Sequence, residues 1–116
     1  MSGALAVLSG EAAEQAVADR YRRDGYLLRD RRYRRQGGEI DLIMSDAAQI
    51  VFIEVKKARD FDTAAARLRP AQRARLDRTA RHYLAQMPGG QDTCCRFDVA
   101  LVDAVGRVQV IANAFA

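Results

Sequence analysis

The sequence predicts one α/β domain spanning residues 1–116, with a mixed central sheet flanked by helices in the order α-β-β-β-α-β-β. Three observations predict it. The chain has 116 residues, 49% of them hydrophobic and 29% charged, which is the balance of a folded protein with a single core. Helical and strand-like patterns alternate along the chain, separated by clusters of glycine and proline. No internal repeat or linker divides the sequence.

The first helix is predicted over residues 10–24. Ser9 is a suitable N-cap, and Gly25 is suited to the left-handed conformation that commonly ends a helix. Glu14 lies at the edge of the apolar stripe that faces the core. That stripe consists of Ala13, Ala16, Val17 and Tyr21.

Three strands are predicted next. Residues 26–34 form a strand interrupted by charged residues, and a Gly-Gly pair breaks the chain shortly after it. Residues 39–44 and 50–56 are the clearest strands of the chain, and residues 45–49 join them as a hairpin.

The second half of the chain predicts one more helix and two strands. Pro70 is suited to the first turn of a helix that ends at Pro88-Gly89-Gly90. The strands follow over residues 95–102 and 108–111. The helix buries a stripe of Leu76, Ala80, Tyr83, Leu84 and Met87. Its opposite, solvent-exposed face carries Arg75, Arg78 and Arg81.

The predicted hairpin places acidic side chains on one side of the sheet. Side chains alternate along a strand, and a loop symmetric about residues 47 and 48 keeps both faces self-consistent. The expected pairs are Asp41 with Glu54, Glu39 with Lys56, and Ile43 with Phe52. The other face then carries Ile40, Leu42, Met44, Ile53 and Val55.

Directly opposed carboxylates repel each other at Cβ separations of about 4.5 to 5.5 Å, so a positive group is expected between them. Lys56, one shared proton or a divalent cation would each serve. Carboxylate oxygens and water suit Mg²⁺ or Mn²⁺, and a nearby ammonium group completes a constellation typical of nucleases. The alternative is a solvent-exposed face on which these charges form cross-strand ion pairs.

The net charge of +4 is unevenly distributed. Basic stretches over residues 20–35 and 59–81 flank an acidic one over 36–58, and arginine far outnumbers lysine. Arginine binds phosphate through a planar fork, which favours a nucleic-acid partner. A GC-rich genome would explain the excess of arginine but not its clustering.

Several other classes of protein are disfavoured. The longest strongly apolar run is far shorter than the roughly 20 residues of a membrane span. The apolar stretch over residues 4–8 is too short for a secretory signal, so we expect a cytoplasmic protein that does not bind membranes. Cys94 and Cys95 are chain neighbours, which excludes an unstrained disulfide, and the single histidine disfavours a Cys/His zinc site.

Three blocks of the sequence resemble a known family. Residues 38–43 (GEIDLI), 51–56 (VFIEVK) and 95–99 (CRFDV) are similar to the YraN-like family of predicted endonucleases, and the resemblance extends over residues 10–115. That family is assigned to the restriction-endonuclease-like superfamily, which also holds archaeal Holliday-junction resolvases. The resemblance implies a restriction-endonuclease-like fold and hydrolysis of DNA phosphodiester bonds with Mg²⁺ or Mn²⁺.

The resemblance also implies roles for individual residues. Asp41 and Glu54 match the two metal-binding carboxylates, Val55 would add a backbone carbonyl, and Lys56 matches the catalytic lysine. Glu14 matches a glutamate of the first helix that resolvase-like members add to the site, the alternative being a surface acid.

Other positions carry weaker expectations. Glu39 would be a further ligand or a partner of Lys56, and Arg96 with Asp98 would form a structural ion pair. The chain departs from the family pattern where Ala71 replaces a common lysine, and over residues 57–63, which lack the glycine that often follows the lysine motif.

The expected function is therefore a Mg²⁺-dependent endonuclease or resolvase-like nuclease. Its expected partner is DNA, and a homodimer would suit symmetric cutting of two strands. The alternative is a non-catalytic nucleic-acid-binding domain with the same fold, acting with a partner protein. The residues expected to contact nucleic acid are Arg32, Arg34, Arg35, Arg59, Gln72 and Arg73.

Overall fold

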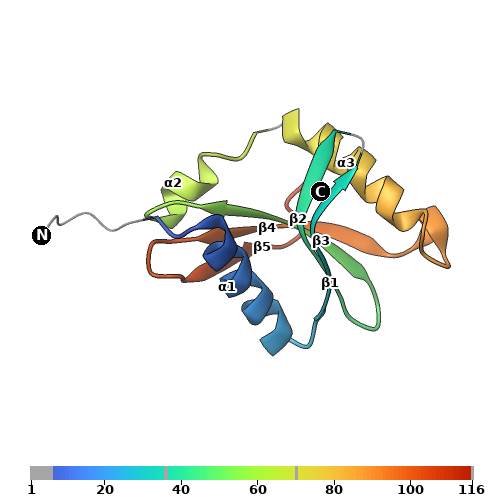
Figure 1. Ribbon diagram of the computed structural model, residues 1–116, viewed down its shortest axis with the longest axis horizontal. Helices are drawn as coiled ribbons and strands as arrows, with labels where there is room; N and C mark the ends of the chain where they lie inside the picture. The colour runs from blue at the N-terminus through green and yellow to red at the C-terminus, as the bar shows by residue number, and fades with distance from the viewer. Residues whose placement is uncertain (1–6, 36, 70, 116) are drawn as a thin grey trace, which may run out of the picture.

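The computed structural model describes residues 7–35, 37–69 and 71–115. Its strands form one five-stranded sheet in the order β1-β2-β3-β4-β5 (Figure 1). All neighbouring strands are antiparallel except β3 and β4, which are parallel. The elements are α1 (Gly10–Arg23), β1 (Leu27–Arg35), β2 (Gly38–Ser45), β3 (Ile50–Lys57), α2 (Phe61–Ala65), α3 (Ala71–Leu84), η1 (Gly90–Asp92), β4 (Cys95–Val102) and β5 (Val108–Ile111). The predicted α/β class with a mixed sheet is confirmed.

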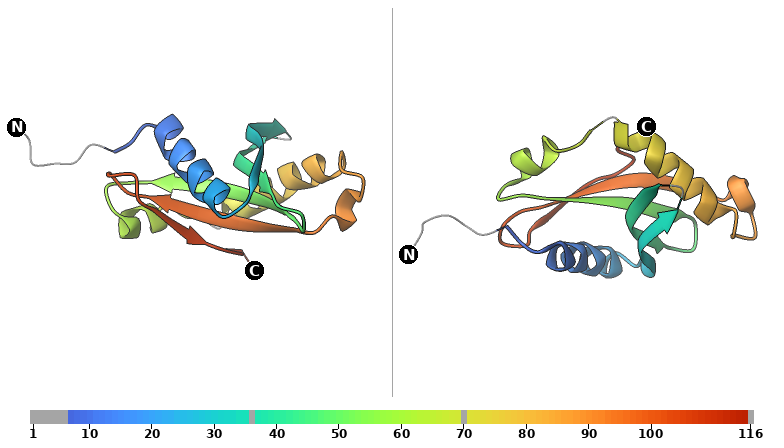
Figure 2. Two further views of the ribbon diagram at one scale, coloured as in Figure 1. Left: turned by 90° about the horizontal axis from the view of Figure 1, so that it is seen from below. Right: turned by 45° about the horizontal axis from the view of Figure 1, so that its top comes forward.

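Helices cover both faces of the sheet. The right-hand view of Figure 2 shows α1 on one side and α2 and α3 on the other. Of the stripe predicted for the first helix, Ala13, Val17 and Tyr21 are buried against the first face with Leu42 and Ile53, whereas Ala16 is half-buried and Ala18 is buried in its place. On the second face α3 buries Leu76, Ala80, Tyr83 and Leu84, and α2 buries Ala64. No helix of the described part of the chain is long and apolar enough to cross a membrane.

The strand boundaries lie within one residue of those predicted. Ser9 caps α1 by accepting the Ala12 N–H at 3.1 Å, and Gly25 follows the helix with a φ of +93°. Pro70, expected to open the second helix, lies outside the described residues. The structure adds α2 and the 3₁₀ turn η1, which are too short to produce a helical period in the sequence.

The β2–β3 hairpin has the predicted register over its paired part. Ile43 lies opposite Phe52, and the last pair is Leu42 with Ile53. Beyond it the strands separate, and Asp41 Oδ2 accepts the Val55 N–H at 2.8 Å in place of a backbone ladder bond. Asp41 and Glu54 therefore stand where two strands diverge, just beyond the last pair of the ladder.

The β1–β2 ribbon changes face at the same point. Arg31 pairs with Leu42 and contacts α1 through Gln15, whereas the next pair, Tyr33 with Ile40, packs under α3. Arg32 lies between the two pairs and has a left-handed φ of +49°. At this residue the side chains of β1 change face, so that Arg31 lies towards α1 and Tyr33 lies under α3.

This reversal corrects the prediction for Ile40. It was expected on the side of Leu42, but it is buried on the opposite face, with Tyr33 and Leu76. Gly38 brings the hairpin directly onto α3: a Cβ there would lie 2.9 Å from the Arg75 carbonyl oxygen and would overlap Thr79 Oγ1. The free end of the ribbon is thereby bent towards α3.

Candidate active site

A groove opens between the end of the β1–β2 ribbon and the first half of α3. Its volume is about 640 Å³, and Asp41 and Glu54 both line it. The Glu54 side chain is only 14% exposed, so this carboxylate is largely shielded from solvent. The other charged residues that line the groove are Arg34, Arg35, Glu39 and Arg75.

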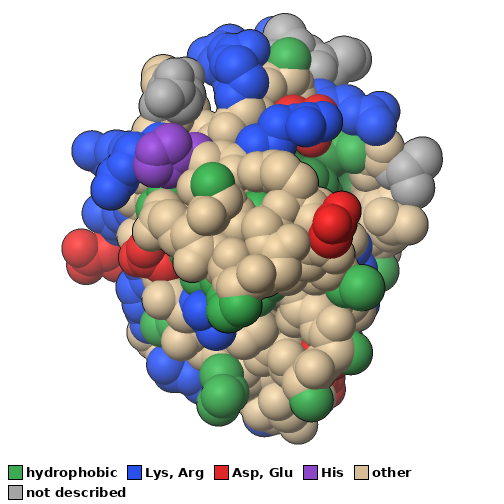
Figure 3. Space-filling view, turned by 90° about the vertical axis from the view of Figure 1, so that its right-hand side faces the viewer, with side chains coloured by type: hydrophobic (Ala, Val, Ile, Leu, Met, Phe, Trp, Pro, Cys, Tyr) green, Lys and Arg blue, Asp and Glu red, His purple; other side chains and the backbone are tan. Residues whose placement is uncertain are grey.

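The surface around the groove is mainly basic. Figure 3 views the molecule from the right-hand side of Figure 1. Near the top of this view, where Figure 1 places the start of α3 and the end of the β1–β2 ribbon, acidic atoms lie between Lys and Arg side chains. The arrangement combines a small acidic centre with basic surroundings, which suits an anionic ligand held beside carboxylates.

Glu54 and Asp41 interact directly. Burial of Glu54, its hydrogen bond with Asp41 and the charge of Asp41 together raise the pKa of Glu54 to about 8, against the opposing effect of Lys56. Lys56 Nζ lies 3.8 Å from Glu54 Oε1. Lys56, one of the expected positive groups, is thus in place beside the carboxylates, and the raised pKa of Glu54 favours its protonated form.

Glu39 forms an ion pair with Arg34 and not with Lys56. The sequence offered it as a partner of Lys56, but its Oε2 lies 3.4 Å from Arg34 Nε, its neighbour across the β1–β2 ladder. The strands diverge before the expected pair of Glu39 and Lys56 is reached, which removes that contact. Lys56 is paired with Glu54 instead.

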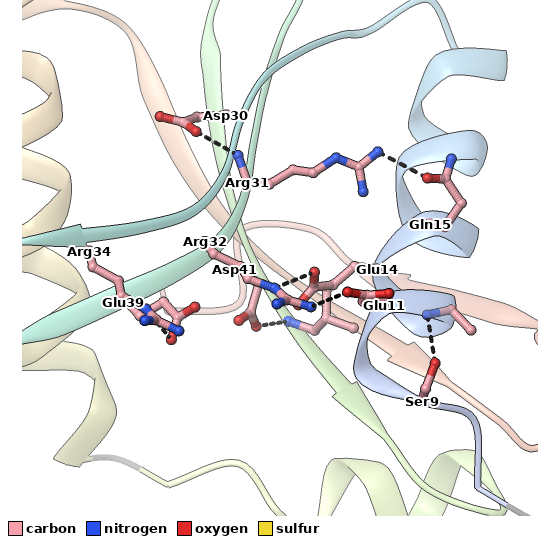
Figure 4. A network of polar contacts seen from close by, with 12 residues as sticks. Ser9, Glu11, Glu14, Gln15, Asp30, Arg31, Arg32, Arg34, Glu39 and Asp41 are labelled. Carbon is pink, nitrogen blue, oxygen red and sulfur yellow. Dashed lines mark hydrogen bonds and ion pairs between the residues drawn. The ribbon is translucent and has the colours of Figure 1, made fainter.

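Glu14 lies on α1, where Arg32 holds it. Its Oε1 accepts from Arg32 Nε at 3.1 Å, and Arg32 also lies 4.0 Å from the exposed Glu11 (Figure 4). Glu14 is buried but does not line the groove. Its link to the site runs through Arg32. The chain neighbours of Arg32, Arg31 and Tyr33, pair with Leu42 and Ile40, which are the residues on either side of Asp41. A role for Glu14 beside Asp41 stays a prediction.

The residues expected to contact nucleic acid divide into two sets. Arg34, Arg35 and Gln72 line the groove. Arg32 is turned to α1, Arg59 is paired with Asp60 at the start of α2, and Arg73 lines a separate pocket of about 130 Å³.

Sequence reasoning missed one groove residue. Arg75 was assigned to the solvent-exposed face of the helix, and it is exposed, but it also lines the groove. Helical periodicity shows which face is polar, not which loop or hairpin approaches that face. The Gly37-Gly38 pair in the sequence could have indicated that another element packs closely there, because a glycine permits the close approach of the ribbon to α3.

Asp98 lies away from the groove, and its expected structural role is confirmed. It is fully buried and accepts hydrogen bonds from Arg96 at 2.9 and 3.1 Å, from Tyr21 at 2.6 Å and from the Asn113 backbone at 3.0 Å. These bonds tie β4 to α1 and to the C-terminal segment.

The donor set at the groove suits a hard cation. Asp41 and Glu54 offer carboxylate oxygens, which Mg²⁺ and Mn²⁺ prefer, and Mg²⁺ commonly retains several waters beside one or two carboxylates. Within the described ranges no three His, Cys, Asp or Glu side chains gather as a possible metal site. The candidate ligand set is therefore a pair of carboxylates.

Comparison with known proteins identifies the family. Residues 13–102 match the model of the Uncharacterised protein family UPF0102. A UPF0102 protein of Cereibacter sphaeroides is 51% identical over 116 residues, covering 100% of this chain and 99% of that protein. One from Ruegeria pomeroyi is 51% identical over 108 residues (93% and 88%), and one from Roseobacter denitrificans is 44% identical over 113 residues (97% and 88%). The chain therefore belongs to the UPF0102 family.

Proposed function

We propose that this protein is a Mg²⁺-dependent nuclease that hydrolyses phosphodiester bonds of DNA. The observation that carries the proposal is the contact between Asp41 and Glu54 inside a groove whose basic lining comes from Arg34, Arg35 and Arg75. Two neighbouring carboxylates in a groove offer the oxygen ligands that a divalent cation prefers, and arginines beside them suit a phosphate ligand.

The chemistry follows from the donor set. Asp41 and Glu54 would hold the ion, which supplies activation of a water molecule and neutralisation of charge on the phosphate. Lys56, next to Glu54, would stabilise charge that develops at the reacting phosphate. The groove arginines would bind the phosphates on either side of the cut.

The resemblance to YraN-like predicted endonucleases supports the same proposal. It favours DNA as substrate and implies that Asp41 and Glu54 hold the metal and that Lys56, which lies beside Glu54, is catalytic. A contribution of the Val55 carbonyl, a homodimer and a cytoplasmic location stay predictions.

One observation favours a second candidate, a nucleic-acid-binding domain that performs no chemistry. Glu14 and Glu39, the further acids expected near the site, are each paired with an arginine, Arg32 and Arg34. These ion pairs leave Asp41 and Glu54 as the two carboxylates for a metal, without the additional acidic ligands that the sequence led us to expect.

Calorimetric titration with Mn²⁺ tests the metal site. Asp41→Asn and Glu54→Gln should each lower Mn²⁺ affinity at least about tenfold, because a neutral amide lacks the charge that holds a hard cation. Asp62→Asn, an exposed acid on α2 that does not line the groove, is the matched control and should bind Mn²⁺ as the wild type does. Unchanged affinity in both groove variants would remove the metal site from the proposal.

Cleavage of labelled DNA separates the two candidates. The nuclease proposal expects Mg²⁺-dependent products that are absent with Glu54→Gln. Binding of DNA by the wild type without any products would instead favour the binding domain.

A further inference from the structure

We infer that the groove accepts one strand of nucleic acid at a time, so that the substrate is unpaired where it is cut. The inference rests on the proposed function and names its substrate class: a single strand, or the single-stranded arm of a duplex, rather than a continuous double helix. Its support is the size of the groove, the depth of the reacting groups, the rigidity of the walls and the chemistry of the lining.

The size of the groove is the first step. A volume of about 640 Å³ is that of a pocket for a ligand of drug size, comparable to one or two nucleotides. B-form DNA is so wide that its major groove alone, about 12 Å across, admits an α-helix. This volume is therefore matched to the backbone of one strand rather than to both strands of a double helix.

The depth of the reacting groups is the second step. The side chain of Glu54, which lines the groove, is 14% exposed, whereas that of Arg34 is 71% exposed. A phosphate held only by the exposed arginine would remain outside, away from the carboxylates. The phosphate to be cut must enter the groove, and the nucleotides on both sides must follow it.

The walls are fixed, which is the third step. Thr79 is fully buried and donates from Oγ1 to the Arg35 carbonyl at 3.0 Å, so the ribbon is bonded to α3. Gly38 packs on the same turn of α3 without room for a Cβ. Tyr33 adds a hydrogen bond of 2.6 Å between its hydroxyl and His82 Nδ1. Widening the groove to admit a second strand would break these contacts together.

The chemistry of the lining is the fourth step. Arg34 and Arg35 on the ribbon and Arg75 on α3 present guanidinium groups from two elements, a geometry suited to successive phosphates of one chain. Among the described residues that line the groove none is aromatic, so bases are not offered a stacking surface. Phosphate contacts position a strand without reading its sequence, so recognition is expected to be sequence-independent.

Fluorescence anisotropy tests the inference without requiring cleavage. A labelled 30-nucleotide single strand, its blunt duplex and the same duplex with a single-stranded arm are titrated with the full chain in Ca²⁺. We expect the single strand and the armed duplex to bind at least about tenfold more tightly than the blunt duplex. Arg75→Ala should weaken single-strand binding about threefold or more, whereas Arg78→Ala, on the same helix but not lining the groove, should not.

The outcomes separate this inference from the proposed function. Equal or tighter binding of the blunt duplex, or equal losses from Arg75→Ala and Arg78→Ala, would overturn the inference. The same three substrates are then incubated with Mg²⁺. Cleavage within continuous duplex would also overturn the inference while supporting a nuclease, and selective strand binding without cleavage would support the inference while refuting the nuclease. Absence of binding to every substrate would refute both.

Discussion

Asp41 combines two tasks that are usually separate. Its Oδ2 replaces a missing ladder bond by accepting the Val55 N–H at 2.8 Å, and the same carboxylate contributes to the raised pKa of Glu54. A backbone N–H that would otherwise be unpaired thus orients a carboxylate for the site. Asparagine retains an oxygen that can accept the Val55 N–H, so Asp41→Asn should fold while losing the charge that a cation needs.

The raised pKa of Glu54 predicts how stability depends on pH. The pKa of Glu54 is about 8 in the folded protein, against an ordinary value of 4.5, so the folded state binds the proton more tightly than the unfolded state. Stability from this group is fully present below about pH 4.5 and is lost as the pH rises towards 8. Glu54→Gln removes the ionisation and should not show this loss.

Thermal unfolding in EDTA between pH 5 and pH 9 measures the effect. The difference between the melting temperatures of Glu54→Gln and the wild type should increase in favour of the variant by about 4 °C or more from pH 5 to pH 9. This shift corresponds to roughly 1 kcal/mol for a domain of this size. If the difference between the two melting temperatures were the same at every pH, the pKa of Glu54 would not be raised by folding.

Lys56 should act in chemistry more than in metal binding. Its ammonium lies 3.8 Å from Glu54, but the carboxylates are the groups that suit a cation. Lys56→Ala is expected to lower cleavage at least about 100-fold while Mn²⁺ affinity changes less than about threefold. Titration calorimetry and a gel assay on the same preparation check both values, and a variant that cuts as the wild type does would assign the lysine another role.

At the scale of elements, the contact of the β1–β2 ribbon with α3 defines the groove. Gly38 is the closest point, and Thr79 bonds the ribbon backbone beside it. The side chains of β1 change face at the left-handed Arg32, a conformation that costs of order 1 kcal/mol for a residue other than glycine. The ion pairs of Arg32 with Glu14 and Glu11 help to offset that cost.

Gly38→Ala should therefore destabilise the protein. The added Cβ would overlap Thr79 Oγ1 and crowd the Arg75 carbonyl, and overpacking of this kind costs about 1 to 3 kcal/mol. Gly10→Ala, at a helical position with nothing within 4 Å of the added Cβ, is the matched control and should be neutral or stabilising. Urea unfolding gives both values, and equal effects of the two substitutions would show that the ribbon is free to move from α3.

Local patterns predicted the strands and the hairpin register, but not how the elements meet. The alternation of apolar and polar side chains is a local property of each strand, and it is enough to predict that Ile43 lies opposite Phe52. The left-handed Arg32 has no such signal, since arginine is not a residue that favours this conformation. The face of Ile40 and the place of Arg75 in the groove both depend on that bend, so neither follows from periodicity.

At the scale of the whole molecule, the basic residues are not equivalent. Arg34, Arg35 and Arg75 line the groove, whereas Arg96 is bonded to buried Asp98 and Arg107 to Asp103. If the protein binds nucleic acid as proposed, the net charge of +4 would attract any nucleic acid, whereas the release of counterions would depend on the arginines that contact phosphates.

Salt dependence distinguishes the two contributions. Removing Arg34 and Arg35 together should make the slope of log affinity against log salt shallower by about 1.4 for a single strand, at about 0.7 per phosphate contact. Arg78→Ala with Arg81→Ala changes the net charge equally and should leave the slope nearly unchanged. Equal slopes for the two double variants would show that net charge alone drives binding.

Strands β1, β2 and β3 are consecutive antiparallel neighbours, so they can pair as soon as residues 27–57 are available. The parallel β4 joins β3 only after the chain has closed a loop that contains α2 and α3, and such non-local closure is slow. We therefore expect Asp41 and Glu54 to come together early in folding and the wall supplied by α3 to form late. An incompletely folded chain would then hold both carboxylates without a groove, and the groove itself would exist only in the finished molecule.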